Sequence, residues 1–199
     1  MPGVIGNPAK RKRESSEKRA TKRARSESSD DIQTRRDAIL LLGDEIFKSK
    51  KNYNNIVCLI KILGSENDDS AAAAISLCRV FAKLMLSGDM VKKPGSTEKE
   101  AVVIRWLKER YSEYKSALIV LLGREDVGST AMTLCMTLLK KEGQYLRNGE
   151  EYCFPVVFLT TIIQALLNPE SHESVRREFG TKYVEEYDDI RFYTFKAIE

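Results

Sequence analysis

The residue types that most often catalyse reactions or bind metals are sparse in this 199-residue chain. The single histidine, His172, follows Pro169 by three positions and has no cysteine near it in the sequence. A zinc site needs several such ligands, and a general base needs a group that it can reach and deprotonate. We therefore expect His172 to lie at the surface or at a helix cap. We predict no metal, no cofactor and no small-molecule substrate.

Two acidic pairs near the end of the chain, Glu185-Glu186 and Asp188-Asp189, are the other candidates for chemistry. Adjacent positions on a helix do not face each other, so neither pair is expected to act as metal ligands or as an acid–base pair. Asp188 or Asp189 is instead predicted to cap a helix. The sequence also lacks the GxxxxGK[ST] and GxGxxG phosphate-binding motifs. These observations together predict a protein that is not an enzyme.

The cysteines and aromatic residues fit packing better than chemistry. No cysteine forms a CxxC pair, and three of the four lie in helical patterns among aliphatic residues, where we expect free thiols that pack as small hydrophobic side chains. Several aromatic residues could stack on nucleic-acid bases, but most fall at helical spacing, which favours core or helix–helix packing. The cysteines are Cys58, Cys78, Cys135 and Cys153, and the aromatic residues are Tyr111, Tyr114, Tyr187, Phe192, Tyr193 and Phe195.

The first 31 residues differ sharply from the rest in composition. They contain no aromatic residue and carry nine basic against five acidic residues, whereas residues 32–199 hold 24 of each sign. A segment with so little apolar surface cannot offset the entropy lost on ordering. We therefore expect a disordered basic tail at residues 1–31 and a folded domain at residues 32–199. The balanced domain should bind RNA weakly, and the tail should strengthen that binding without sequence preference.

The basic residues of the tail form two clusters, at residues 10–13 and 22–25, separated by eight residues. Two clusters on a flexible spacer can enter two acidic pockets of an import receptor, which predicts a bipartite nuclear-localisation signal. The alternatives are an arm that binds RNA phosphates and a charged terminus that is merely solvated. The predicted signal consists of Lys10, Arg11, Lys12, Arg13, Lys22, Arg23 and Arg25.

Ser28 is a candidate phosphorylation site because an acid, Asp31, follows it three residues on, as acid-directed kinases favour. A phosphate there would add negative charge beside the second basic cluster and weaken its contact with the receptor. The alternative is that the serines of this stretch are linker and that Asp31 caps a helix.

Beyond residue 31 the apolar residues recur with a helical period, and there is no strand or hairpin signal. Thr97 and Glu100 match a capping box, and Pro155 suits the first turn of a later helix. That helix holds the longest apolar run, which is shorter than the roughly 20 residues that span a membrane. Helices are predicted at about residues 32–48, 52–63, 69–88, 98–122, 129–142, 155–167, 172–179 and 190–199, with an exposed linker at 89–96.

A hydrophobic residue, a glycine and a nearby acid recur at residues 42–45, 63–66 and 122–125. The last two are expected to end helices, whereas at Gly43 the helix is expected to continue with at most a kink. Helix pairs then recur at roughly 40 residues, as in HEAT or armadillo repeats. The predicted fold is an all-α, HEAT/armadillo-like repeat array, with an irregular helical bundle as the alternative.

Three stretches resemble one known family. WLKERYSEYKSALIVLLG (residues 106–123), AMTLCMTLLKKEGQYL (131–146) and YDDIRFYTFKAI (187–198) resemble, in this order, the N-terminal half of the nucleolar complex protein 4 family. The resemblance implies a nucleolar factor for small-ribosomal-subunit assembly that forms a heterodimer with another nucleolar assembly factor. The family's partner-binding residues belong to a C-terminal domain outside this chain, so none is carried over.

We thus expect a non-catalytic helical scaffold of the nucleus and nucleolus, imported through its tail, whose association with pre-ribosomal RNA can be indirect and which does not contact membranes. The alternatives are a helical-repeat adaptor in nuclear transport or RNA processing, and a direct RNA-binding helical module.

The last helix carries Ile190, Phe192, Phe195 and Ile198, and no glycine, proline or polar run that would end a helix follows them. These side chains need a neighbour, which predicts that the chain is a piece of a longer protein.

Overall fold

The computed structural model describes residues 31–65, 69–146, 153–168 and 171–199, and these ranges contain helices and turns but no strand. The predicted all-α class is therefore confirmed. The chain divides into two compact units, Met1–Ala38 and Ile39–Glu199. In the first unit residues 31–38 are helical, and the Gln33 amide donates a hydrogen bond of 2.8 Å to Asp37. The predicted import residues (Lys10, Arg11, Lys12, Arg13, Lys22, Arg23 and Arg25) and Ser28 lie outside the described residues.

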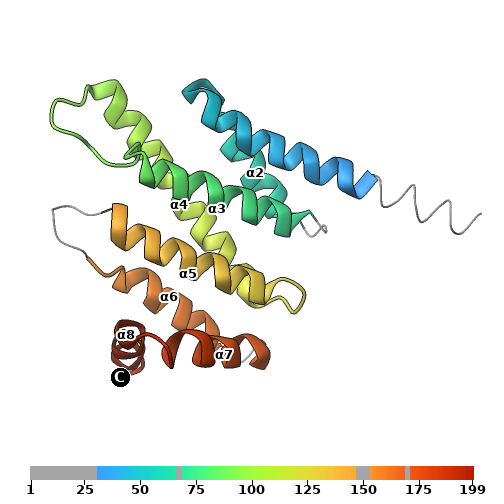
Figure 1. Cartoon of the computed structure of the whole chain (residues 1–199), viewed down its shortest axis with the longest axis vertical. Coiled ribbons are helices and arrows are strands. Elements are labelled where there is room, and N and C mark those ends of the chain that lie inside the picture. Colours follow the sequence, from blue (N-terminus) through green and yellow to red (C-terminus); the bar gives the residue numbers. More distant parts are fainter. Residues whose placement is uncertain (1–30, 66–68, 147–152, 169–170) are drawn as a thin grey trace, which may run out of the picture. The chain divides into compact units, whose positions relative to one another are not determined.

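The helices follow one another along the chain and agree with the predicted ranges to within a few residues (Figure 1). The main differences are that α5 continues past Gly143, and that a π-helical turn, η2, extends α7. After a first helix at residues 31–48 the elements are η1 (Lys50–Asn54), α2 (Asn55–Leu63), α3 (Ser70–Leu86), α4 (Glu98–Leu122), α5 (Gly128–Tyr145), α6 (Val156–Leu167), α7 (Glu173–Phe179), η2 (Gly180–Val184) and α8 (Asp188–Ile198).

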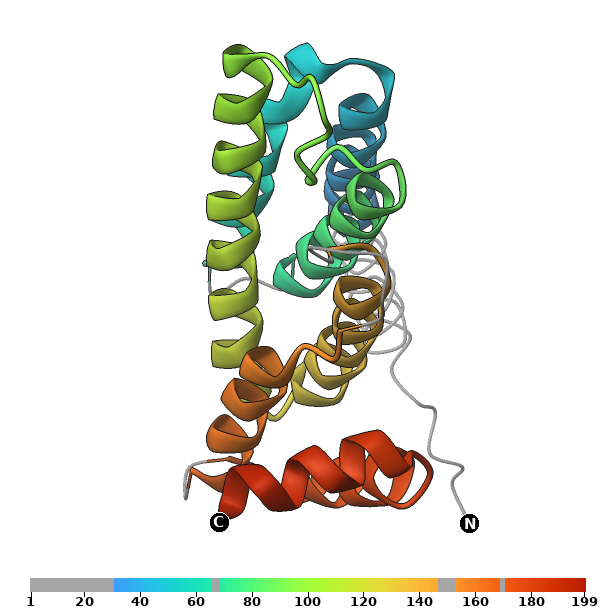
Figure 2. The same ribbon diagram turned by 90° about the vertical axis from the view of Figure 1, so that its left-hand side faces the viewer.

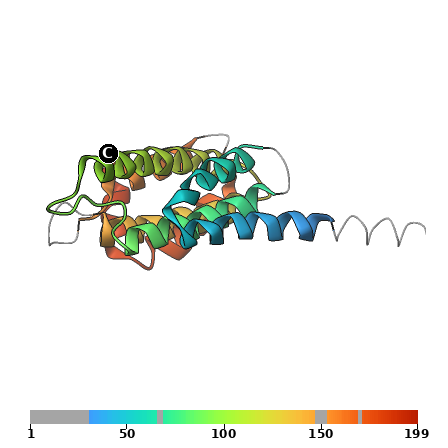
Figure 3. The same cartoon turned by 90° about the horizontal axis from the view of Figure 1, so that it is seen from above.

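Within the second unit the helices alternate between two layers. The helices α3, α5 and α7 pack successively in one layer, and α2, α4, α6 and α8 do so in the other. Figures 2 and 3 show α4 on the opposite side from α3 and α5. This alternation is that of stacked helical hairpins and favours a repeat array over an irregular bundle. The starts of α3, α5 and α7 lie 58 and 45 residues apart, so the repeat is less regular than the predicted 40 residues.

Local signals set several helix ends. The Thr97 hydroxyl accepts a hydrogen bond from the Glu100 amide at 3.3 Å, and the Glu100 carboxylate accepts one from the Thr97 amide at 2.8 Å. This reciprocal pair is the predicted capping box of α4. The helices α2 and α4 end directly before Gly64 and Gly123, as predicted. Pro155 stands at the cap position of α6 rather than in its first turn, which is a small correction.

The connection between α3 and α4 is anchored in the core. Met90 is fully buried, so the prediction of an exposed linker at residues 89–96 is wrong at this position. Gly88 has a φ of 74°, and the next amide, of Asp89, donates a hydrogen bond of 3.0 Å to the Leu84 carbonyl. This reversal is a common way to end a helix, and here it directs the following residues back towards the core.

Gly43 lies where the first helix passes close to α3. The helix runs through residues 31–48 without interruption, as predicted for this glycine. A Cβ atom at Gly43 would overlap the Ser76 hydroxyl, which donates a hydrogen bond of 3.5 Å to the Ile39 carbonyl. Only glycine allows the two backbones to lie this close without a shift of Ser76.

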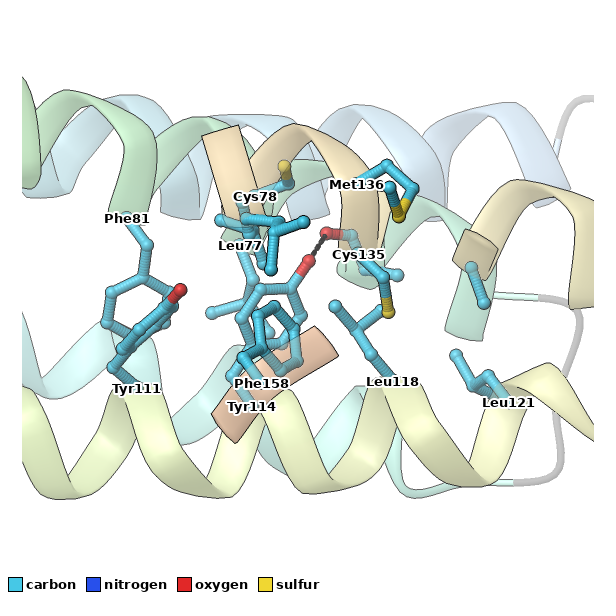
Figure 4. Packing of buried hydrophobic residues seen from close by; sticks show 14 of the residues in the cluster. Leu77, Cys78, Phe81, Tyr111, Tyr114, Leu118, Leu121, Cys135, Met136 and Phe158 are labelled. Atoms are coloured by element: carbon cyan, nitrogen blue, oxygen red, sulfur yellow. Dashed lines mark hydrogen bonds between the residues drawn. The ribbon is translucent and has the colours of Figure 1, made fainter. Parts of the chain in front are cut away.

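Aromatic rings hold α3 against α4 (Figure 4). The Phe81 ring centroid lies 5.1 Å from that of Tyr111 and 5.5 Å from that of Tyr114. The Tyr114 hydroxyl donates a hydrogen bond of 2.6 Å to the Ala74 carbonyl, which satisfies its polar end within the core. The packing role predicted for Tyr111 and Tyr114 is therefore confirmed.

The apolar run at residues 154–167 contains α6, which packs one face against the core, whereas Val157 on its other side is 84% exposed. Its inward side chains are spaced for one face of a helix, so this face closes against α4 and α5. In the described ranges no helix is both long and apolar enough to cross a membrane. The buried residues of α6 are Phe158, Leu159, Ile162, Ile163 and Leu166.

Candidate protein-docking surface

The histidine and the acids singled out in the sequence lie at two different places, before α7 and at the start of α8. His172 lies half-buried directly before α7, where a cap was one of the expected roles, but its side chain makes no capping hydrogen bond. Glu185 and Glu186 are both exposed. Across the described ranges no cluster of three or more His, Cys, Asp or Glu could hold a metal ion.

The predicted capping role of Asp188 or Asp189 is wrong. Tyr187 occupies the cap position, and both aspartates lie in the first turn of α8. Their charges there interact favourably with the helix dipole. Asp188 also forms an ion pair of 2.7 Å with Arg191, whose guanidinium donates to the carbonyls of residues 184 and 185 as well. The aspartates and Arg191 therefore fix the start of α8.

The cysteines are free thiols, and two of them are core residues. Burial raises the pKa of the Cys78 thiol to about 11 and that of Cys135 to about 12. Both thiols stay protonated at neutral pH and are poor nucleophiles. Packing was expected for the three cysteines in helical patterns, and it is confirmed for Cys78 and Cys135. It is wrong for Cys58, which is exposed, as is Cys153.

A partly buried ion pair ties α4 to α5. The Lys115 ammonium lies 3.2 Å from the Glu142 carboxylate, and the Tyr111 hydroxyl donates to the same carboxylate at 3.0 Å. The ammonium also lies 4.7 Å from the ring centres of Tyr111 and Phe158. Burial raises the pKa of Tyr111, chiefly because its anion would lose solvation. Lys115 and Tyr111 thus both contact the Glu142 carboxylate. We interpret this cluster as a contact that holds α4 against α5.

The last helix, α8, presents large apolar side chains to solvent. Phe192, Phe195 and Ile198 are 61%, 59% and 54% exposed, and their three-residue spacing places them on neighbouring turns of one side of the helix. We call these three residues the α8 row. Ile190 and Thr194 are buried on the other side. The helix therefore has apolar residues on the face that packs against the fold and also on a face that is open to solvent.

The inward side of α8 is firmly held, which fixes the direction of the α8 row. The Tyr193 ring stacks on the Phe154 ring with a centroid distance of 4.4 Å and an interplanar angle of 14°. Ile190 belongs to the same hydrophobic core as α5 and α6. The α8 row is therefore exposed on a helix whose opposite side is packed against the rest of the fold.

A cleft of about 370 Å³ lies beside the start of α8. Its floor and sides are largely apolar, and Lys140 and Asp189 lie among the lining residues. Tyr187 lines the cleft and is 53% exposed. We call this hollow the α5–α8 cleft. Its apolar lining is Met136, Leu139, Phe154, Tyr183, Tyr187 and Ile190.

The aromatic residues singled out in the sequence thus divide into two groups. Tyr193 packs against the fold as predicted, whereas the packing prediction is wrong for Tyr187, Phe192 and Phe195, which are exposed. The cleft residues Phe154 and Tyr183 were not identified from the sequence. They come from separate segments, and nothing in their local spacing indicates that they share a hollow with α5.

Comparisons with known proteins cover most of the chain. A family model described as "Nucleolar complex protein 4-like, TPR repeats" matches residues 26–199. An uncharacterized protein of Schizosaccharomyces pombe is 29% identical over 163 residues, which is 78% of this chain and 33% of that protein. Nucleolar complex protein 4 homolog A of Xenopus laevis is 26% identical over 75% of this chain and 31% of its own length. The Gallus gallus homolog is 22% identical over 82% of this chain and 35% of its own.

The chain spans about a third of the length of the curated relatives it matches. No solved structure matches it. The repeat model agrees with the two alternating layers of helices, and the predicted resemblance is confirmed over a longer stretch than the three motifs that indicated it. The chain belongs to the nucleolar complex protein 4-like family.

Proposed function

We propose that this chain is a helical scaffold segment of a nucleolar factor for small-ribosomal-subunit assembly, and that it acts by binding proteins rather than by catalysis. The stack of helices in two alternating layers is the observation that carries the binding role, because repeat arrays of this kind present extended surfaces to which other proteins bind. Family membership and the names of the frog and chicken relatives support the nucleolar setting.

The occupant that we propose for the α8 row is a further helix of the same family protein. About two thirds of each relative's length lies outside the match, which leaves ample chain for further helix pairs. A helix of this kind would place its own apolar residues against Phe192, Phe195 and Ile198. Full burial of each such side chain contributes about 1.5–3 kcal/mol, so three of them would hold the added helix.

Copurification tests the assembly role. The tagged protein, isolated from nuclear extract, is expected to enrich small-subunit precursor RNA together with small-subunit assembly factors, relative to a tag-only control. Mass spectrometry identifies the proteins and hybridisation identifies the RNA. Enrichment of transport receptors or of messenger-RNA processing factors without precursor RNA would contradict the proposal and support a general helical adaptor.

Hydrogen exchange tests the occupant of the α8 row. In the 199-residue chain α8 is packed on one side only, so we expect its amides to exchange faster than in a longer protein, and we expect concentration-dependent association on gel filtration. In a protein of the relatives' full length we expect slow exchange in α8. The triple variant Phe192→Ser, Phe195→Ser, Ile198→Ser should abolish the association, because it removes the exposed apolar surface.

A matched control places the same change elsewhere. Leu86, Val120 and Val157 are 62%, 73% and 84% exposed on α3, α4 and α6, and their replacement by serine should leave the association unchanged. Slow exchange across α8 in the 199-residue chain, with monomeric behaviour at all concentrations, would show that the row needs no cover and would refute this occupant.

A further inference from the structure

The neutral helical domain is not neutral everywhere, because positive charge is concentrated in two short segments. Residues 48–51 and 83–108 together contain nine basic and three acidic residues. The remainder of residues 32–199 therefore carries 15 basic against 21 acidic residues. The net charge of residues 32–199 is zero, and for this reason only weak RNA binding was predicted. The fold, however, separates positive from negative charge within this domain.

The fold joins these two segments at one corner of the second unit. Figure 2 shows η1, the connection after α3 and the start of α4 at the same end of the stack. Lys50 and Lys93 line one hollow of about 210 Å³ together with Lys99, although Lys50 is more than 40 residues away in the sequence. Lys48 lines an adjoining hollow that shares Lys50 with the first.

A third hollow extends the positive surface along α4. It is lined by three basic residues, Lys92, Arg105 and Lys108, and by one acid, Glu109, and it shares Ile104 with the first hollow. The three hollows therefore form one continuous surface, which we call the basic corner. Its basic residues, all exposed, are Lys48, Lys50, Lys83, Lys92, Lys93, Lys99, Arg105 and Lys108.

The two acids that line the first hollow are already engaged. Asp89 forms an ion pair of 3.1 Å with Lys50 and accepts a hydrogen bond from the Ser87 hydroxyl. The Glu100 carboxylate accepts hydrogen bonds from the amide and hydroxyl of Thr97. Within the described residues the remaining basic side chains of the corner form no ion pair, so their charge faces solvent.

We infer that the basic corner binds the phosphate backbone of RNA without reading its sequence. Seven of its eight basic residues are lysines, whose compact charges suit phosphates in many orientations rather than one fixed bidentate geometry. Lysine is depleted in protein–protein interfaces, which rely on an apolar centre, whereas backbone binding rests on lysine and arginine. An acidic protein segment is therefore the less favoured occupant. This inference does not depend on the assembly role or on the α8 row.

The test measures binding of a fluorescent 20-nucleotide RNA of mixed sequence by anisotropy at several KCl concentrations. The full chain is used, with the basic residues of 10–13 and 22–25 changed to alanine so that the tail contributes little. We expect a dissociation constant of about 10⁻⁴ to 10⁻⁶ M, as for nonspecific binding. The corner variant, Lys92→Glu, Lys93→Glu, Lys99→Glu, should bind about tenfold more weakly or worse, with a salt slope smaller by about 2.

The control variant, Lys61→Glu, Lys140→Glu, Lys196→Glu, has the same net charge as the corner variant and changes exposed lysines elsewhere. Its binding should stay within about twofold of the parent, which identifies the corner rather than net charge as the cause. Thermal melting checks that both variants fold. Equal losses in both variants would overturn the inference, as would an absence of binding by the parent. Competition by polyglutamate as strong as that by unlabelled RNA would also overturn it, in favour of an acidic protein segment.

Discussion

Replacing Phe81 by alanine is expected to lower the free energy of unfolding by about 4 kcal/mol, because the change removes a large ring from the centre of the core. Phe81 is fully buried and lies against the rings of Tyr111 and Tyr114, so its loss leaves a cavity between α3 and α4. The two tyrosines are held by hydrogen bonds to Glu142 and Ala74, which limits their movement into that cavity. Urea denaturation followed by circular dichroism measures the difference.

The matched control for this change is Leu86→Ala on the same helix. Leu86 is 62% exposed at the end of α3, so its truncation should change the free energy of unfolding by less than about 0.5 kcal/mol. Similar small losses for the two variants would mean that α3 and α4 do not pack as described. A change in the denaturant dependence of Phe81→Ala would indicate that unfolding is no longer a single cooperative step.

Replacing the basic residues of clusters 10–13 and 22–25 by alanine is expected to move the protein from the nucleus to the cytoplasm. We propose that both clusters bind the import receptor at once, so that loss of both removes the avidity on which import depends. The substitutions replace only basic side chains and remove no apolar one, so the melting temperature of the purified variant should not change. Microscopy of a fusion to a bulky fluorescent protein, too large to diffuse passively, measures the distribution.

The spacer between the clusters supplies the control. Lys18→Ala with Arg19→Ala removes two positive charges from the same segment but leaves both clusters intact, so nuclear accumulation should persist. If the double-cluster variant still concentrates in the nucleus, the signal lies elsewhere or the protein enters with a partner.

The variant Ser28→Asp tests whether phosphorylation at this position opposes import. It adds a negative charge near the second cluster, so nuclear accumulation should fall without being abolished.

The helix ends could be predicted because their signals act over a few residues. The capping box of Thr97 and Glu100 and the stops at Gly64 and Gly123 each depend on neighbours in the sequence. The burial of Met90 depends instead on how the chain turns at Gly88 and on what lies beneath it. The spacing of apolar residues and the local composition therefore could not predict that Met90 is buried.

The surfaces were harder to predict than the helices, because a surface joins residues that are far apart in the sequence. Lys50 and Lys93 share a hollow only once η1 has folded against the connection after α3. A net charge summed along the chain cannot reveal such a pairing. For Phe192 and Phe195 the helical spacing favoured packing, and the sequence also indicated that they need a neighbour. The described residues leave both side chains exposed.

The alternation of the helices between two layers has a consequence for how such proteins change over evolution. Each helix of the stack packs mainly against the helices next to it, so adding or losing a pair at one end leaves the interior contacts in place. The uneven intervals between the starts of α3, α5 and α7 are tolerated for the same reason, since a longer helix or turn projects from the stack without disturbing its neighbours. Lineages can therefore differ in length while they keep the same core pairs.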